Sequence, residues 1–307
     1  MAIVVVGAVF VDIKGFPNDL YIPKGRNAGR VEIVHGGVGR NVAKDIANLE
    51  LRPRFVSMVD DTPEGVAVEK NLRDHKVDTQ YLITVPDGMG MWLAVFDETG
   101  DLAGSISKRP VMDPLAKLIE EKGDEIFSGA DSIITEIDID KNVLKQVFFY
   151  AEKYDIPVYA VVANMSIASK RRDLILKTSC FVCNEQEAGI LFVRKFEGMG
   201  PDELRDELSE LVIRAGIPAM VVTMGGQGSV YATRDGRKGY CPAHHVSVRD
   251  TTGAGDAFCA GVSVGLTYGK TMDESLEIGT RLAASVITVS ENVCPRFQPA
   301  EFGLQVD

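Results

Sequence analysis

Near its C-terminal end the chain reads Asp250-Thr251-Thr252-Gly253-Ala254-Gly255-Asp256-Ala257-Phe258, and small and apolar residues continue to Leu266. Glycines permit a tight turn with exposed backbone N–H groups, and the predicted helix that follows directs its positive N-terminal end to the same place. Such a turn can bind a phosphoryl anion, and Asp256 within it is suited to accept a proton from an attacking hydroxyl. On these residues alone, a simple glycine turn with Asp256 as a helix N-cap is at least as good an explanation.

The rest of the chain alternates between predicted strands and predicted helices. Residues 201–215 place Leu204, Leu208 and Leu211 on one helical stripe, and Gly216 follows as a stop signal. Continuous apolar runs typical of strands buried on both faces occur at Ile3–Val6, Ser132–Ile137, Val158–Ala163 and Ala219–Thr223. This alternation predicts an α/β fold with a mostly parallel sheet and helices on both of its faces.

Two stretches break the alternation, residues 13–34 and residues 84–110. Both carry turn residues between short alternating segments, as in Met91–Phe96 followed by Asp97–Gly100. We expect β-hairpins there, either as a lid projecting from the main sheet or as an extension of its edge. No linker or internal repeat divides the chain, so residues 1–307 are predicted to form one unit.

The charge balance is acidic, with 33 lysines and arginines against 44 aspartates and glutamates and a formal net charge of −11. This balance argues against nucleic acid or an anionic membrane surface as a partner. Apolar runs are too short to span a bilayer, and no signal peptide is recognisable. We therefore expect a cytoplasmic protein.

Five cysteines are expected to be free thiols in that compartment. Cys180 and Cys183 form a CxxC pair, but residues three apart in a strand point to opposite faces of the sheet. This geometry favours buried structural thiols over a metal or redox pair. The four histidines show no spacing typical of metal ligands.

Two further glycine clusters, Gly36–Gly39 and Gly225–Gly228, fit neither a Walker motif nor a GxGxxG dinucleotide fingerprint. Together with other residues they form four ordered motifs: His35-Gly36-Gly37-Val38-Gly39-Arg40-Asn41, Asn184-Glu185-Gln186-Glu187, Val222-Thr223-Met224-Gly225-Gly226-Gln227-Gly228, and the run from Asp250 to Phe258. On these motifs the chain resembles the ribokinase-like carbohydrate kinases, often called the PfkB family, over nearly its whole length. The resemblance implies a three-layer α/β fold, with a mostly parallel central sheet and a small β-strand lid.

The resemblance also implies an enzyme that transfers phosphate from ATP to a hydroxyl of a sugar or nucleoside. Asp256 would be the base, and the amides of Gly253, Ala254 and Gly255 would stabilise the transferring group. The implied nucleotide contacts are Asn184, Thr223, Gly225, Gly228 and Thr252. The implied magnesium ligands are Glu187, Asn184 and Asp250, and carbonyls near Asp250 could hold K⁺, which activates some relatives.

Implied substrate contacts lie at the other end of the chain, at Asp12, Gly37, Asn41 and Glu136. Asp12 is expected to close the first strand, at the edge where parallel sheets bind their ligands. Polar side chains that accept or donate two hydrogen bonds suit the vicinal diols of a sugar.

Within the family, the sequence from Gly36 to Ala43, which includes Arg40, is most similar to that of the pseudouridine kinases. Asn164-Met165 and the lid pair Lys108-Arg109 depart from the pattern usual in those kinases. The predicted acceptor is therefore stated only as pseudouridine-like or ribose-like. The basic pair is interpreted as a solvated loop, although it would also suit an acidic acceptor.

Two other classes of protein remain open. One is a catalytically silent sensor of sugars or nucleotides on the same fold, and the other, more remote, is a Rossmann-type oxidoreductase. Exposed strands such as Met91–Phe96 would leave an unpaired sheet edge, which relatives often cover by pairing two lids. A homodimer through the lid is therefore expected.

Overall fold

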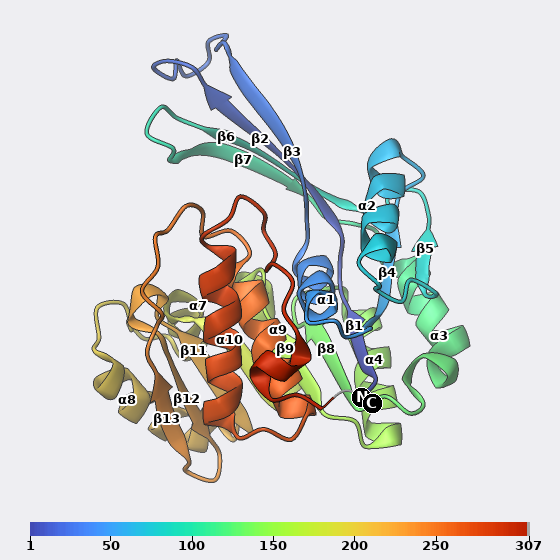
Figure 1. Ribbon diagram of the computed structural model, residues 1–307, viewed down its shortest axis with the longest axis vertical. Coiled ribbons are helices and arrows are strands. Elements are labelled where there is room, and N and C mark those ends of the chain that lie inside the picture. Colours follow the sequence, from blue (N-terminus) through green and yellow to red (C-terminus); the bar gives the residue numbers. More distant parts are fainter. Residues whose placement is uncertain (306–307) are drawn as a thin grey trace.

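The computed structural model describes residues 1–305 and contains a large sheet covered by helices and a small sheet that projects from it (Figure 1). Neighbouring strands of the large sheet are parallel from β11 to β5, and β12 and β13 are antiparallel. In spatial order the strands are β13 (Lys238–Cys241), β12 (Ser229–Thr233), β11 (Ala219–Thr223), β10 (Cys180–Asn184), β9 (Val158–Val161), β8 (Ser132–Glu136), β1 (Ile3–Val6), β4 (Arg54–Val59) and β5 (Leu82–Thr84). The predicted α/β fold with a mostly parallel central sheet is confirmed.

Helices lie between these strands and after the last of them. They are α1 (Val38–Asn48), α2 (Pro63–Asp74), α3 (Asp113–Phe127), α4 (Lys141–Tyr154), α5 (Met165–Ala168), α6 (Arg172–Ile175), α7 (Glu185–Phe192), α8 (Pro201–Ala215), α9 (Ala254–Thr267) and α10 (Met272–Val286), with 3₁₀ turns η1 (Gly225–Gln227) and η2 (Pro299–Phe302). Helices α3, α4, α7 and α8 share a hydrophobic core with one face of the sheet. Helices α1, α2, α9 and α10 share a second core with the other face.

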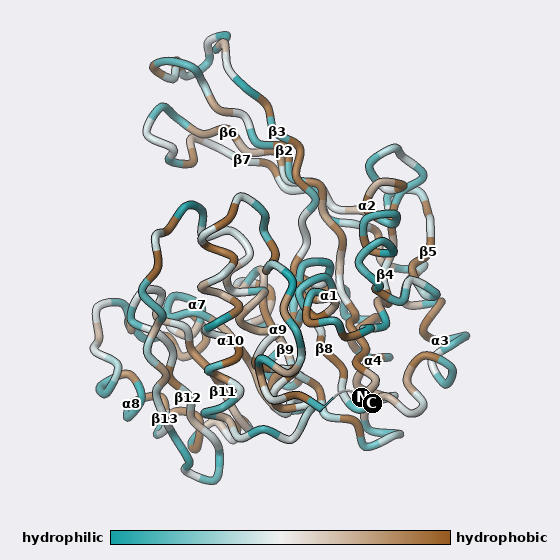
Figure 2. Tube along the Cα trace, in the orientation of Figure 1, coloured by the Kyte–Doolittle hydropathy of each residue, from teal (hydrophilic) through white to brown (hydrophobic). Residues whose placement is uncertain are grey.

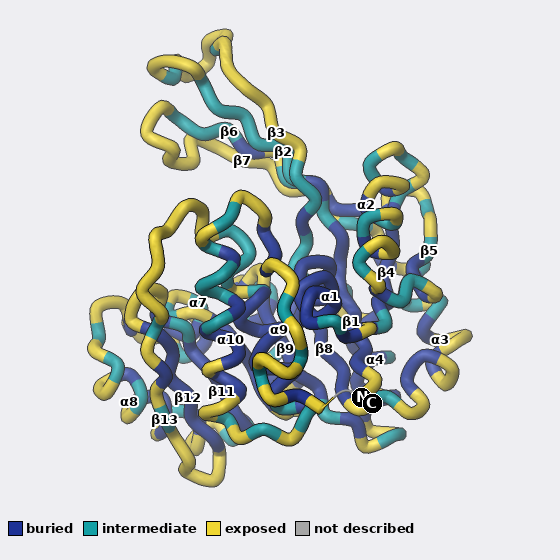
Figure 3. The backbone as a smooth tube through the Cα atoms, in the orientation of Figure 1, coloured by how far each residue is buried: buried dark blue, intermediate teal, exposed yellow. Residues whose placement is uncertain are grey.

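The strands of the large sheet are buried on both faces because successive side chains enter different cores. In β1, Val4 and Val6 belong to one core and Ile3 and Val5 to the other, which explains why the run is continuously apolar. Figure 3 shows these central strands as the most deeply buried part of the molecule.

The same alternation separates the two cysteines of the CxxC pair. Cys180 lies in one core and Cys183 in the other, and both are free and buried. Residues 1–305 contain no cluster of three or more His, Cys, Asp or Glu side chains that could hold a metal ion. Within this range no helix combines the length and the apolar character needed to cross a membrane.

The small sheet has four strands in the order β3-β2-β6-β7 and stands away from the helical body (Figure 1). They are β2 (Phe10–Pro17), β3 (Gly29–Gly36), β6 (Gly90–Phe96) and β7 (Leu102–Lys108). The sheet is separate from the large one and is not an extension of its edge, and its strands β2 and β3 reach slightly beyond residues 13–34 on both sides. We call this four-stranded sheet the lid.

Hydrophobic positions lie along the lid strands (Figure 2), and most residues of these strands are exposed or half-buried (Figure 3). Four of the hydrophobic residues form a row across the lid, in which Ile33, Leu93 and Ile106 are exposed and Ile13 is half-buried. Ile33, Ile13, Leu93 and Ile106 are direct cross-strand neighbours along this row. Such a row on an open sheet is suited to pairing with another surface. The homodimer through the lid stays a prediction.

The expectation that Asp12 closes the first strand is wrong. Strand β1 ends at Val6, and Asp12 lies in the lid strand β2, opposite Val34 of β3 and Trp92 of β6. The apolar run continues past Val6 without a polar break, so hydrophobicity alone does not show where the chain leaves the large sheet. The physical reason for the break is Gly7, where the chain passes the start of α1.

Gly7 and Gly39 allow the two backbones to touch. A Cβ atom added to Gly39 would lie 2.6 Å from the Cα atom of Gly7, and one added to Gly7 would lie 2.7 Å from the Cα atom of Gly39. Neither contact leaves room for a methyl group. The close approach fixes the start of α1 against the end of β1, from which the chain continues into the lid.

We predict that Gly39→Ala lowers the free energy of unfolding by about 1–3 kcal/mol, because the backbone must shift to accommodate the methyl group. Gly104→Ala in β7 is the matched control, since a Cβ there meets nothing within 4 Å. Urea unfolding followed by circular dichroism should show that the control lowers the free energy of unfolding by less than about 0.5 kcal/mol. Equal effects of the two substitutions would contradict the tight contact.

Candidate active site

The glycine turn before α9 is packed on one side and open on the other. Gly253 is the N-cap residue and has a left-handed φ of 82°. A Cβ atom there would lie 2.1 Å from the carbonyl oxygen of Asn292, so glycine is required, whereas one on Gly255 would meet nothing within 4 Å. The N–H of Ala254 donates to the carbonyl of Thr251 at 3.2 Å within the turn. The open side leaves the N-terminus of α9 accessible to an anion.

Asp256 lies half-buried in the first turn of α9, where Nδ2 of Asn41 from α1 donates to its Oδ2 at 2.7 Å. Burial raises the pKa of Asp256 to about 7. The hydrogen bond from Asn41 and the charge of Arg40 oppose this rise, and the carboxylates of Glu187 and Asp12 add to it. A pKa near neutrality suits a general base, because the group is then both ionised and able to take up a proton.

A cavity of about 540 Å³ opens at the carboxyl ends of β9, β10 and β11, where open parallel sheets bind their ligands. Three of the four sequence motifs meet in its walls. The predicted site residues that line it are Asn184, Glu187, Thr223, Gly225, Gly255 and Asp256. We call it the central cavity.

Asn184 and Glu187 form a capping box at the start of α7. Oδ1 of Asn184 accepts from the N–H of Glu187, and Oε2 of Glu187 accepts from the N–H of Asn184, each at 2.8 Å. Burial raises the pKa of Glu187, although the bond from Asn184 opposes this. Glu187 faces the same cavity as the base, and Glu185 and Glu197 also line it. Carboxylates beside the base fit Mg²⁺, which takes few protein ligands when nucleotide phosphates supply others.

A second cavity of about 440 Å³ adjoins the first and shares Thr223, Gly225 and Gly255 with it. Apolar side chains dominate its walls, as is usual for a site that takes a flat ring system. Its other lining residues include Gly228, Ala243, His245, Val246, Val248, Thr251, Phe258, Ala283, Ala284 and Ile287. Sequence reasoning missed residues 243–248 and the α10 contribution, because neither carries a motif. We call this the apolar cavity.

Asp250 and Thr252 were also predicted as site residues. They line neither cavity, and Oδ1 of Asp250 accepts from the N–H of Thr252 at 2.9 Å. The Asp250 side chain therefore supports the turn that leads into α9. Its role as a metal ligand stays a prediction.

Glu136 is buried, at 3% exposure, and its contacts are with the protein backbone. Its Oε1 accepts from the N–H of Ala8 at 2.7 Å and from the N–H of Gly39 at 2.9 Å. This one oxygen thus joins the segment between β1 and the lid to the first turn of α1. The predicted contact of Glu136 with substrate is untested, but its positioning role is visible.

Asp12 and Gly37 lie close to the same junction. Gly37 has φ of 96°, and a Cβ atom there would lie 2.5 Å from the carbonyl oxygen of Ala8, so this position too requires glycine. Burial raises the pKa of Asp12, while Lys14 and Arg40 oppose the rise. The lid therefore carries a carboxylate near the start of α1.

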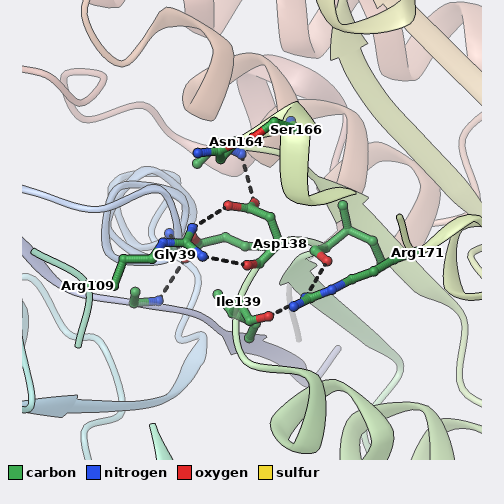
Figure 4. Close-up of polar contacts among 11 residues, drawn as sticks. Gly39, Arg109, Asp138, Ile139, Asn164, Ser166 and Arg171 are labelled. Atoms are coloured by element: carbon green, nitrogen blue, oxygen red, sulfur yellow. Dashed lines mark hydrogen bonds and ion pairs between the residues drawn. The ribbon is translucent and has the colours of Figure 1, made fainter. Parts of the chain in front are cut away.

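Arg109, directly after β7, joins the lid to the body (Figure 4). Its Nη2 donates to Oδ2 of the fully buried Asp138 at 2.8 Å, and its Nη1 donates to the carbonyl of the same residue at 3.0 Å. Oδ1 of Asp138 accepts from the N–H of Ala163 at 2.9 Å. The side chains of Lys108 and Arg109 are both exposed, but Arg109 also binds a buried carboxylate that is 29 residues away in sequence.

The fold, with its separate lid, and the carboxylate at a glycine-capped helix define the class of small-molecule kinases built on a ribokinase-like α/β sheet. The chain belongs to the pfkB family of carbohydrate kinases, whose model matches residues 2–294. The predicted family is confirmed.

Similar proteins include both nucleoside and sugar kinases. Guanosine-inosine kinase of Exiguobacterium acetylicum is 35% identical over 292 residues, covering 94% of this chain and 95% of the relative. Pseudouridine kinase of Escherichia coli K12 is 24% identical over 266 residues, covering 85% of this chain and 82% of the relative. Pseudouridine kinases are thus among the relatives, as expected, but at lower identity.

Solved structures share the fold. Arabidopsis thaliana ribokinase, complexed with ribose and ATP, superposes with a TM-score of 0.82 at 21% identity and full coverage of both chains. Adenosine kinase from Sinorhizobium meliloti has a TM-score of 0.78 at 19% identity, covering 98% of this chain and 97% of that one.

We predict that Arg109→Gln lowers the free energy of unfolding by about 1–3 kcal/mol, because it removes the partner of a buried charge. Lys108→Gln is the matched control, since Lys108 pairs with the exposed Asp87 and should contribute less than about 1 kcal/mol. Urea unfolding of Arg109→Gln and Lys108→Gln, each alone and combined with Asp138→Asn, measures how strongly each position is coupled to Asp138 in the free energy of unfolding. No coupling between positions 109 and 138 would contradict the bond.

Proposed function

We propose that this protein is an ATP-dependent nucleoside kinase that uses Asp256 as its base. The observation that carries the proposal is the position of Asp256, which faces the central cavity together with Glu187, at the N-terminus of α9. A carboxylate with a pKa near neutrality beside an anion-binding helix end is the arrangement that phosphoryl transfer to a hydroxyl requires.

In the proposed reaction the acceptor hydroxyl donates its proton to Asp256 while its oxygen attacks the γ-phosphorus of ATP. The bond from the γ-phosphorus to the β,γ-bridging oxygen breaks, and ADP leaves. Backbone amides at the start of α9 would stabilise charge on the transferring group, with Gly255 on the open side of the turn. The amides of Gly253 and Gly255 would contribute directly, whereas that of Ala254 would exchange its bond to the carbonyl of Thr251 for one to the phosphate. Glu187 would hold Mg²⁺, which neutralises phosphate charge when bound.

The two cavities suggest where ATP and the acceptor bind. The apolar cavity would take the nucleobase of ATP, with Gly225 and Gly228 permitting close backbone approach, and the phosphates would lie toward the central cavity. The acceptor would lie between the body and the lid. There Asp12, Asn41 and the backbone of Gly37 would bind sugar hydroxyls, which accept and donate hydrogen bonds.

A nucleoside acceptor is favoured by the relative that acts on guanosine and inosine, because its 35% identity extends over 94% of this chain. Both of those nucleosides carry a purine with an oxygen at position 6. We propose them as the first acceptors to test, ahead of pseudouridine and ribose. Activation by K⁺ near Asp250 and pairing of two lids are further parts of the proposal.

Measurement of ADP release with ATP and Mg²⁺ tests the acceptor. We expect kcat/KM for guanosine or inosine to exceed that for ribose by at least about tenfold, the usual effect of losing the contacts of one substrate group. Adenosine and pseudouridine complete the panel. Thermal stabilisation by nucleoside and ATP without any ADP release would overturn the kinase and favour a sensor.

Asp256→Asn should lower kcat by at least about a hundredfold, since it removes the proton acceptor. In the wild type, kcat/KM should fall as pH drops through about 7, because the protonated carboxyl cannot accept a proton. Burial of the charge raises the pKa of Asp256 and so costs stability at neutral pH, and the uncharged amide in Asp256→Asn should not lower the melting temperature. Near-normal turnover by the folded variant would exclude Asp256 as the base.

A further inference from the structure

Arg40 is a buried cation to which the proposed mechanism gives no role. It lies in the first turn of α1 and is 4% exposed. Burial lowers the pKa of Arg40 to about 10, so the side chain stays charged at neutral pH. A buried guanidinium is costly unless its surroundings compensate the charge. The acidic groups around it are Asp12, Asp45, Asp256 and Glu291.

The hydrogen bonds of Arg40 fix the orientation of Asn41. Nη1 of Arg40 donates to Oδ1 of Asn41 at 2.8 Å. Because a guanidinium has donors and no acceptor, the Asn41 atom that faces it must be the oxygen. The NH₂ group of Asn41 is therefore on the other side, where it donates to Oδ2 of Asp256 at 2.7 Å. Without Arg40 the amide could turn its oxygen toward a protonated Asp256 and accept its proton in a hydrogen bond, which would stabilise the neutral acid over the ionised base.

A second amide anchors Arg40 to the C-terminal part of the chain. Nη1 of Arg40 also donates to Oδ1 of Asn292 at 3.2 Å, and Nδ2 of Asn292 donates to the carbonyl of His35 at 2.9 Å. The backbone carbonyl of Asn292 is the same group that packs against Gly253. One guanidinium thus links the start of α1 to the segment that supports the anion-binding turn.

We propose that Arg40 is a positioning residue for the catalytic base: it orients the amide of Asn41 onto Asp256, and its charge stabilises the ionised carboxylate. This inference rests on the proposed role of Asp256. It predicts that loss of the Arg40 charge makes the base harder to ionise, whereas loss of packing alone would lower activity equally at every pH.

Several charged groups face Asp256, so the effect of Arg40 must be separated from theirs. Arg40 is the cation among them, and the acidic groups oppose ionisation of the base when they are themselves ionised. Burial raises the pKa of Asp45 and of Glu136 to about 8, so these two are largely protonated at neutral pH. By element the acidic groups are Asp12 on β2, Asp45 on α1, Glu136 on β8 and Glu187 on α7, with the thiol of Cys259 on α9 itself. Removing Arg40 leaves these groups uncompensated near the base.

The test compares pH profiles of kcat/KM for ADP formation in the wild type, Arg40→Gln and Arg40→Lys. Arg40→Gln should move the acid limb up by about one pH unit or more, the usual effect of losing a nearby opposite charge. Activity should then fall about eightfold or more at pH 6.5 and recover partly at pH 8.5. Arg40→Lys keeps the charge, so its acid limb should stay near that of the wild type while kcat falls.

Titration of ¹³C-labelled aspartate carboxyl groups by NMR gives a readout independent of turnover, with Asp256→Asn to assign the signal. The Asp256 midpoint should rise in Arg40→Gln. Arg237→Gln, in the exposed turn between β12 and β13, is the matched loss of one arginine and should leave both readouts unchanged. Circular dichroism verifies folding of each variant.

An unchanged midpoint and an unchanged acid limb in Arg40→Gln would overturn the role of Arg40. A wild type that forms no ADP with any nucleoside would instead overturn the proposed function, and the NMR titration would still decide whether Arg40 controls the carboxyl group. The two failures are therefore distinguishable.

Discussion

The architecture of the site depends on one carboxylate oxygen, Oε1 of Glu136, which binds two backbone amides from segments far apart in sequence. Its buried bonds to Ala8 and Gly39 hold the end of β1 against the start of α1, and the Gly7–Gly39 contact makes this approach possible. From that junction the chain runs into the lid in one direction, and α1 carries Asn41 toward α9 in the other. A buried carboxylate is expensive unless it is bonded, and here its bonds set the geometry on both sides of the site.

A protein with a net negative charge can bind phosphate groups when the positive potential at the binding site does not depend on lysines and surface arginines. It comes from the backbone dipoles at the start of α9, from the buried Arg40 and from a metal ion held by Glu187 in the proposed function. Several of the 44 acidic residues gather around the central cavity and the lid junction. Burial raises the pKa of Asp12, Glu187 and Asp256, and neighbouring carboxylates add to the rise at Glu187 and Asp256. For Asp256 the result is a pKa of about 7, so its ionisation is balanced at neutral pH.

Much of the fold was predictable from the sequence, since continuous apolar runs such as Ile3–Val6 and helical stripes such as Leu204–Leu208 report burial directly. The motifs also predicted residues that converge on one cavity, including Asn184, Glu187 and Asp256. What was missed depends on contacts between distant segments. The apolar run through Val11 gave no sign that Asp12 belongs to the lid, and Arg109 finds its partner 29 residues away. The α10 wall of the apolar cavity consists of the small residues Thr280, Ala283 and Ala284, whose ordinary helical spacing does not distinguish a binding surface from a core face.

The parallel pairing of β2 with β6 has a consequence for how the molecule folds. Each outer pair of the lid, β2 with β3 and β6 with β7, is a hairpin that can form within microseconds from local contacts. Joining the two hairpins side by side in parallel is different, because the chain between them includes α1, β4, α2 and β5 and must first close a long loop. Folding of that intervening segment brings the two hairpins together and lowers the cost of closing the loop. Order in the lid is therefore coupled to the folding of β4 and β5, at one edge of the large sheet.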